Sequence, residues 1–190
     1  MTRCTFELSN NNGGPFQNIC VKSGDKNLSL NVSRCPVPFG VSENNSKKDM
    51  SLVLGDKHTS MIMLFAQYDK DAMTKIEELI IEDNDGDIVY NQTVQQPNKK
   101  YDPYFKVRIN DATLIYDDAK VLKSVNDIKK GAFVDVKFEC GGIWVMKDIG
   151  KAGTTWYAKE IKILPMKKIG LAQQAQPAKQ EVYEFNEDDM

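Results

Sequence analysis

The two tryptophans of the chain, Trp144 and Trp156, flank a short segment rich in glycine and lysine. This segment contains Lys147 and Lys151 and is typical of a turn between two strands. An aromatic ring that faces solvent can stack with a nucleobase, while a neighbouring cation contacts a phosphate. Large aromatic side chains also pack in protein cores, so the pattern leaves open whether the two rings face outward or inward.

The orientation of the rings depends on the alternation of the strands that carry them. Residues 133–146 and 155–164 alternate between apolar and polar side chains, as half-buried strands do. The Gly-Gly pair at 141–142 suits a bulge or sharp bend that resets the alternation. If the aliphatic residues that flank the glycine- and lysine-rich turn face the core, Trp144 and Trp156 point outward.

A further strand is expected over residues 104–109. Its apolar side chains share one face, and Tyr104, Lys106 and Arg108 share the other. Outward aromatic and cationic side chains on neighbouring strands would suit single-stranded nucleic acid, whose bases stack and whose phosphates attract positive charge. The candidate nucleic-acid-binding residues are Tyr104, Lys106, Arg108, Lys137, Trp144, Lys147, Lys151, Trp156 and Lys162.

Strands, glycine bends and one helix together predict a mainly β fold. The apolar run at 61–68 is expected to be a buried strand, and residues 69–82 have apolar side chains at helical spacing, with Asp71 as a candidate cap. A strand over 78–82 that pairs with 87–91 is the alternative to this helix. At this size the pattern indicates an OB-fold-like five-stranded Greek-key barrel with an extended N-terminal region, with an open β-sandwich as the alternative.

One domain is expected over residues 1–168, followed by a flexible acidic tail over residues 169–190. Residues 1–60 are rich in Asn, Ser, Gly and Pro, which predicts a loop-rich N-terminal portion of short strands joined by long loops. Residues 169–190 contain few large apolar side chains and cannot bury enough surface to fold alone.

Charge is segregated along the chain, although the net charge is only −2. Residues 99–168 carry fifteen Lys or Arg against nine Asp or Glu, whereas residues 169–190 carry one against five. A basic middle segment favours a polyanionic partner, with solvated lysines as the plainer interpretation. Since the chain has twenty-two Lys and three Arg, contacts with phosphates are expected rather than bidentate readout of bases.

Catalysis and metal binding find little support in the sequence. No P-loop, G-x-G-x-x-G or G-x-S-x-G motif occurs, and His58 is the only histidine. The four cysteines are too widely spaced for a typical zinc site, and the acidic run 82–87 departs from the EF-hand template and is expected to be a turn. No apolar run approaches the ~20 residues that span a bilayer. We therefore expect an intracellular protein with reduced thiols, no enzyme activity, no cofactor, no metal and no membrane association.

Three segments resemble the single-stranded-DNA-binding proteins of large nucleocytoplasmic DNA viruses. They are "DPYFKVRI" (102–109), "GAFVDVKFECGGIWV" (131–145) and "TWYAKEIKIL" (155–164), the last running into a proline. The resemblance implies an OB-fold that coats single-stranded DNA during replication, recombination or repair, at the site of viral DNA replication. It also implies that Trp144, Trp156 and the outward face of residues 104–108 line the strand.

The C-terminal residues are similar in character to the acidic tails of phage and bacterial single-strand-binding proteins. Those tails recruit replication partners and contain an aromatic residue near the terminus. Here the aromatic residue is followed by five more residues, so the correspondence is loose. The candidate partner-binding residues are Phe185, Glu187, Asp188 and Asp189.

The sequence thus predicts a protein that binds single-stranded DNA without sequence preference and recruits replication proteins through its tail. Its oligomeric state is open, with a homo-oligomer as one possibility. A β-barrel adaptor that binds proteins but no nucleic acid is the main alternative. A second alternative is a hydrolase or nuclease with dispersed carboxylates, and a third is a binding protein whose ligand is RNA rather than DNA.

Overall fold

The structure is a computed structural model that describes residues 4–9, 16–80, 87–98 and 100–165. It is mainly β with one long helix, as predicted. The elements are β1 (Cys4–Leu8), β2 (Phe16–Ser23), β3 (Lys26–Asn27), β4 (Ser29–Val37), β5 (Val41–Asn44), β6 (Lys47–Val53), η1 (Asp56–His58), α1 (Thr59–Leu79), β7 (Val89–Asn91), β8 (Tyr104–Ile109), β9 (Leu114–Asp117), η2 (Val125–Asp127), β10 (Ala132–Met146), η3 (Lys147–Ile149) and β11 (Lys151–Leu164).

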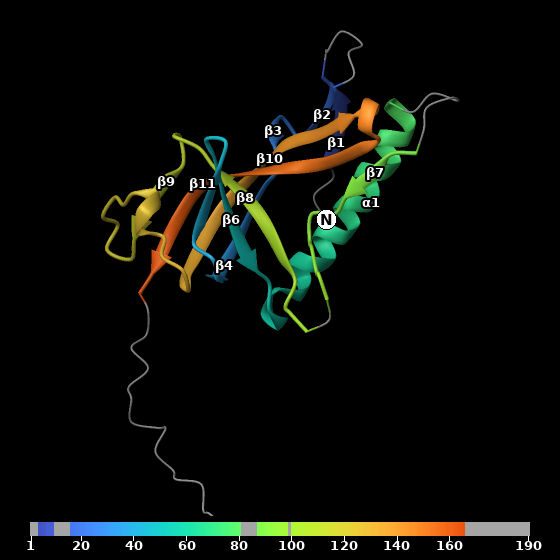
Figure 1. Cartoon of the computed structure of the whole chain (residues 1–190). Coiled ribbons are helices and arrows are strands. Elements are labelled where there is room, and N and C mark those ends of the chain that lie inside the picture. Colours follow the sequence, from blue (N-terminus) through green and yellow to red (C-terminus); the bar gives the residue numbers. More distant parts are fainter. Residues whose placement is uncertain (1–3, 10–15, 81–86, 99, 166–190) are drawn as a thin grey trace, which may run out of the picture.

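The two longest strands, β10 and β11, form an antiparallel pair in the middle of the sheet (Figure 1). From this pair the sheet continues through β2 to β1 on one side, and through β8 and β6 to β5 on the other. Strands β7 and β9 pair parallel with opposite ends of β11. The result is an 11-stranded sheet that is not closed, so the predicted five-stranded barrel is not confirmed.

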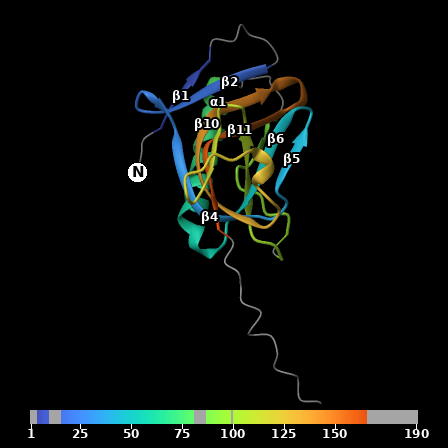
Figure 2. The same ribbon diagram turned by 90° about the vertical axis from the view of Figure 1, so that its left-hand side faces the viewer.

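Strand β10 changes its second partner half-way along. Residues 132–139 pair with β4, whereas residues 143–146 pair with β2 (Figure 2). The change follows a register shift between Cys140 and Ile143, where the predicted bulge at 141–142 is confirmed. A bulge bends its strand and increases the local twist, which allows one strand to join two differently oriented parts of the sheet.

The prediction of a buried strand over residues 61–68 is wrong, because these residues belong to α1. The helix begins at Thr59, so Asp71 lies inside it and caps nothing. Its buried residues follow helical spacing: Phe65, Tyr68, Asp69, Ala72 and Ile76. The remaining apolar side chains between 61 and 68 lie at other angles around the helix, which hides the helical period in the sequence.

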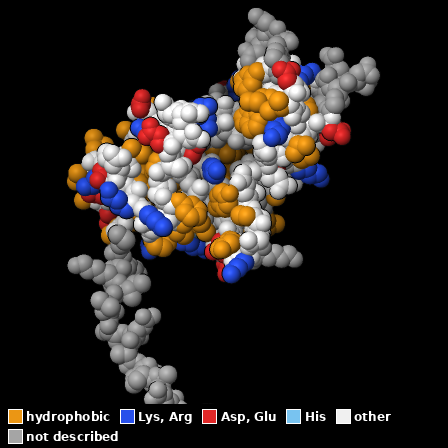
Figure 3. Space-filling view, in the orientation of Figure 1, with side chains coloured by type: hydrophobic (Ala, Val, Ile, Leu, Met, Phe, Trp, Pro, Cys, Tyr) orange, Lys and Arg blue, Asp and Glu red, His pale blue; other side chains and the backbone are white. Residues whose placement is uncertain are grey.

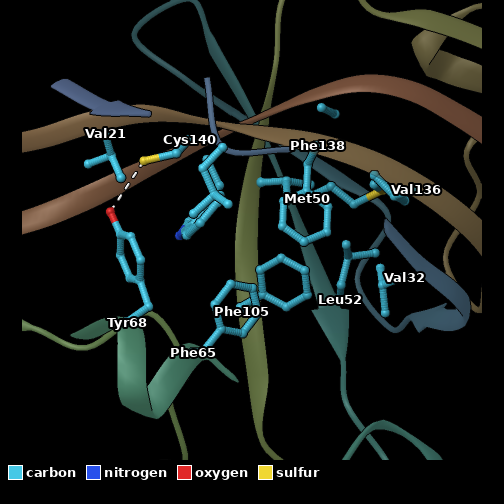
Figure 4. Packing of buried hydrophobic residues seen from close by; sticks show 14 of the residues in the cluster. Val21, Val32, Met50, Leu52, Phe65, Tyr68, Phe105, Val136, Phe138 and Cys140 are labelled. Atoms are coloured by element: carbon cyan, nitrogen blue, oxygen red, sulfur yellow. Dashed lines mark hydrogen bonds between the residues drawn. The ribbon is translucent and has the colours of Figure 1, made fainter. Parts of the chain in front are cut away.

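The side of α1 that faces the sheet closes an aromatic core. Phe65 packs against Phe105 and Phe138 at ring-centroid distances of 5.0 and 6.1 Å, and all three are fully buried (Figure 4). The hydroxyl of Tyr68 lies 3.3 Å from the Sγ atom of Cys140. Such contacts between tilted rings stabilise the pairing of helix and sheet beyond the burial of area alone.

The described part of the first sixty residues contains six strands, where the sequence predicts short strands joined by long loops. Strands β2, β4 and β6 contribute Val21, Val32, Met50 and Leu52 to the core. The predicted turn at 82–87, except for Asp87, and the predicted tail at 169–190 lie outside the described residues. In the described part of the chain, no helix has the length and apolar character required to cross a bilayer.

Candidate nucleic-acid interface

The two tryptophans lie in different environments, and the predicted outward orientation of Trp156 is wrong. Its side chain is only 2% exposed. The indole packs against Phe65, Tyr68 and Phe138 at centroid distances of 5.3, 5.2 and 5.5 Å. Its Nε1–H points toward the hydroxyl of Thr93 at 3.5 Å. A ring enclosed in this way offers no face for a nucleobase.

The error has its origin in a second β-bulge, which the sequence does not reveal. Phe138 pairs with Ala158, but the preceding residue Lys137 pairs with Glu160, so β11 contains one extra residue. The extra residue shifts the alternation, and both Trp156 and Ile161 face the core although five positions separate them. Counting back from Ile161 by twos therefore assigns the indole to the wrong face.

Trp144 does lie on the outer face of the sheet, where it is half-buried. It pairs across the ladder with Gly153 of β11. A Cβ atom at Gly153 would lie 2.8 Å from Cζ2 of Trp144, closer than such atoms approach in proteins. The indole therefore lies directly over the glycine backbone, and a side chain at this position would displace it.

A pocket of about 350 Å³ opens beside Trp144 on the outer face of β11. Its volume is near the lower end of the range of small-molecule sites. β6 and β8 supply one wall, residues 91–95 supply another, and β10 and β11 supply the rest of the lining. The wall at 91–95 is joined to β8 by the bridge between Gln95 and Tyr104. The lining residues are Asp49, Asn91, Gln92, Thr93, Gln95, Lys106, Arg108, Trp144, Gly153, Thr154, Thr155 and Trp156.

Strand β8 presents its predicted outward side chains to this pocket. The alternation is confirmed, since Phe105, Val107 and Ile109 are buried and the residues between them face outward. The Nε atom of Arg108 lies 3.2 Å from Oδ1 of Asp49 on β6. Lys106 is exposed, and among the described residues no carboxylate lies within salt-bridge distance of it. The pocket thus has one cation in an ion pair and one open to an external anion.

The wall at residues 91–95 is held by a buried carboxylate of α1. Oδ2 of Asp69 accepts a hydrogen bond from the backbone N–H of Thr93 at 2.7 Å. Oδ1 accepts one from the Thr93 hydroxyl at 2.6 Å and one from the Tyr90 hydroxyl at 3.1 Å. Burial raises the pKa of Asp69, and these hydrogen bonds oppose the rise. From β8, the Tyr104 hydroxyl donates to Oε1 of Gln95 on this wall at 2.9 Å.

No protein-family model matches the chain, and no curated protein matches it. Among solved structures, gp2.5, a single-stranded DNA binding protein encoded by bacteriophage T7, is similar with a TM-score of 0.54 at 10% sequence identity. The match covers 84% of this chain and 100% of the phage protein. The chain shares the fold of that phage protein.

The single-stranded DNA-binding protein from bacteriophage Enc34 is also similar. Its TM-score is 0.49 at 10% identity, over 88% of this chain and 96% of the Enc34 chain. Its complex with single-stranded DNA gives 0.46 at 11% identity, over 84% of this chain and 94% of the Enc34 chain.

The structure brings some predicted site residues together and separates others. Lys106, Arg108, Trp144 and Trp156 line the pocket, and Tyr104 flanks it. Lys147 and Lys151 lie at the turn between β10 and β11 and do not line the pocket, although Lys151 is only two residues from the lining residue Gly153. Two more lysines lie on the other half of these strands, where Lys137 pairs with Glu160 and Lys162 pairs with Asp118. The candidate tail residues Phe185, Glu187, Asp188 and Asp189 lie outside the described residues.

The sequence interpretation missed the polar wall of the pocket. Asn91, Gln92, Thr93 and Gln95 belong to the run "NQTVQQ", whose amide and hydroxyl groups suit hydrogen bonds with a ligand. This run of side-chain amides was the signal that the sequence offered. Within the described residues, no three of His, Cys, Asp or Glu gather as metal ligands would.

Proposed function

We propose that this protein binds single-stranded DNA with little sequence preference, at the outer-face pocket beside Trp144. One observation carries the proposal: an outward indole, an unpaired lysine and a polar wall meet in one pocket. The fold shared with a phage single-stranded DNA binding protein supports it.

Each component has a physical role in this proposal. A base that stacks on Trp144 would contribute about 1–3 kcal/mol. Lys106 would contact a phosphate without first breaking an internal ion pair, whereas Arg108 already forms an ion pair with Asp49. The side-chain amides of Asn91 and Gln92 can rotate to donate or accept, so they tolerate different base edges. Stacking together with adaptable polar contacts gives binding without strong base selection.

The wider biological role is part of the same proposal. We infer that the protein protects single-stranded DNA in replication, recombination or repair, inside the cell, and that the part of the sheet around β10 and β11 is an OB-type barrel. The viral family resemblance supports this inference, and the acidic residues 169–190 would recruit replication proteins. Deletion of residues 169–190 should leave DNA binding equal or tighter and abolish the partner contact, whereas an adaptor without nucleic-acid binding would show no DNA binding in either form.

Titration of labelled oligo-dT with the full chain, followed by fluorescence anisotropy, tests the proposed site. Trp144→Ala is expected to weaken binding about 5- to 150-fold, which corresponds to the loss of one stacked base. Lys106→Ala is expected to reduce the slope of log K against log salt by about 0.7, the value for one phosphate contact on a single strand. Lys26→Ala, an exposed lysine on β3, is the matched control and should leave both quantities unchanged. Absence of binding at low salt, or equal binding by the Trp144 variant, would overturn the proposal.

A further inference from the structure

The register of the sheet places two rows of side chains on the outer face of β2, β10, β11 and β7. Cross-strand partners point to the same side of a sheet, so each row can be read directly from the pairing. The first row contains Asn18, Trp144, Gly153 and Asn91. The second row, two residues further along each strand, contains Phe16, Met146, Lys151 and Val89.

The second row is an exposed apolar surface around one cation. Phe16 is 43% exposed, Met146 37% and Val89 63%. Met146 lies between Phe16 and Lys151 in the row, and Val89 lies on the other side of the lysine. Figure 3 shows hydrophobic side chains gathered at this end of the sheet, where β2 begins and β10 ends. In the described part of the chain, Lys151 has no carboxylate within salt-bridge distance. Leaving such side chains in water has a cost, which a bound partner would remove.

The two rows form one continuous surface with the pocket. Two residues along a strand span about 6.6 Å, so the second row begins immediately beyond the indole of Trp144. None of the eight side chains in the two rows is acidic, and the second row contains the lysine. Within the two rows, aromatic and apolar side chains lie beside an unpaired cation. Bases can stack on the aromatic rings and a phosphate can contact the cation, so we infer that the occupant is a single strand of nucleic acid.

We propose that this second row, whose aromatic ring is that of Phe16, is a second stacking platform for the same single-stranded DNA. This inference rests on the proposed function. A strand that leaves the pocket past Trp144 would pack its next base on the ring of Phe16 and on Met146. Lys151, which lies on β11 across β10 from Phe16, would contact a phosphate of the same stretch of DNA. The row thereby extends the site across β10 to β2, along a direction set by the sheet register.

Binding of oligo-dT of two lengths to the full chain tests the second platform. A DNA of about 4 nucleotides fills little more than the pocket, and one of about 12 nucleotides also spans the second row. Phe16→Ala is expected to weaken binding of the longer DNA about 5- to 150-fold, the loss of one stacked base, and to leave the shorter DNA unaffected. Phe39→Ala, which removes a 74% exposed aromatic ring between β4 and β5, is the matched control and should bind both lengths normally.

The outcomes separate this inference from the function on which it rests. If the Phe16 and Phe39 variants both bind each length of DNA as tightly as the unmodified chain does, while Trp144→Ala weakens binding, the second platform is refuted and the pocket stands. If the unmodified chain binds neither DNA, the proposed function itself fails. Lys151→Ala provides an independent test, because it should reduce the salt slope for the longer DNA only; an unchanged slope with both lengths contradicts the path over the second row.

Discussion

Replacement of Trp156 by alanine is expected to destabilise the fold severely and to affect DNA binding only as a consequence. The indole lies between α1 and the sheet, in contact with Phe65, Tyr68 and Phe138 at centroid distances between 5.2 and 5.5 Å. Its Nε1–H is directed at Thr93 on the wall of the pocket. Removal of the ring leaves a cavity that rigid neighbours on both the helix and the sheet cannot fill.

The magnitude follows from these contacts. Truncation of a fully buried Trp to Ala costs about 3–5 kcal/mol, and each aromatic pair lost accounts for roughly 0.5–1.5 kcal/mol of it. For a domain of this size, 1 kcal/mol lowers the melting temperature by about 2–4 °C, so we expect a decrease of roughly 6–20 °C. Trp144→Ala is the contrast, because its half-buried ring rests on a glycine. We expect that variant to lose about 1 kcal/mol of stability, within the usual range for single substitutions.

Thermal and denaturant unfolding followed by circular dichroism measures both effects, and anisotropy with oligo-dT measures binding. We predict that Trp156→Ala loses stability and Trp144→Ala loses affinity. If Trp156→Ala keeps the unmodified melting temperature and instead loses affinity at temperatures where it is folded, the assignment of the two rings is reversed and the reasoning fails.

Three further predictions follow from single contacts. Gly153→Ala should weaken oligo-dT binding several-fold, because the new methyl group displaces the indole of Trp144; equal affinity would show that the position of the ring is unimportant. Since the pKa of Asp69 is raised in the fold, the contribution of this carboxyl to the unfolding free energy falls as pH rises above about 4, and Asp69→Asn should remove this decrease. The unfolding free energy of the variant minus that of the unmodified chain should therefore increase with pH. A difference that does not change with pH would contradict the raised pKa of Asp69. In the native protein, exposed Cys20 should react with a thiol reagent well before buried Cys35, whose pKa burial raises to about 12; equal rates measured by peptide mass spectrometry would argue against that burial.

The sequence predicted those strands whose two faces differ clearly. Residues 104–109 and 133–140 alternate without interruption, because one side of each strand packs on the core and the other meets solvent. The bulge at 141–142 was also predictable, since paired glycines tolerate the backbone conformation that a bulge requires.

Other features have no local signature. The bulge opposite Lys137 contains no glycine, so nothing in the sequence indicates the extra residue that turns Trp156 inward. The apolar run at 61–68 contains too few polar residues to show a helical period. The wall at 91–95 is positioned by Asp69, more than twenty residues earlier in the chain, through contacts that only the folded structure defines.

The fluorescence of Trp144 during titration with oligo-dT tests the central claim most directly. Since the chain has two tryptophans, Trp156→Phe leaves Trp144 as the single reporter, and the conservative replacement keeps an aromatic ring in the core. We predict that the emission is quenched as DNA stacks on the indole, that the quenching saturates, and that added salt reverses it. Binding seen by anisotropy with unchanged Trp144 emission would place the DNA elsewhere and contradict the account.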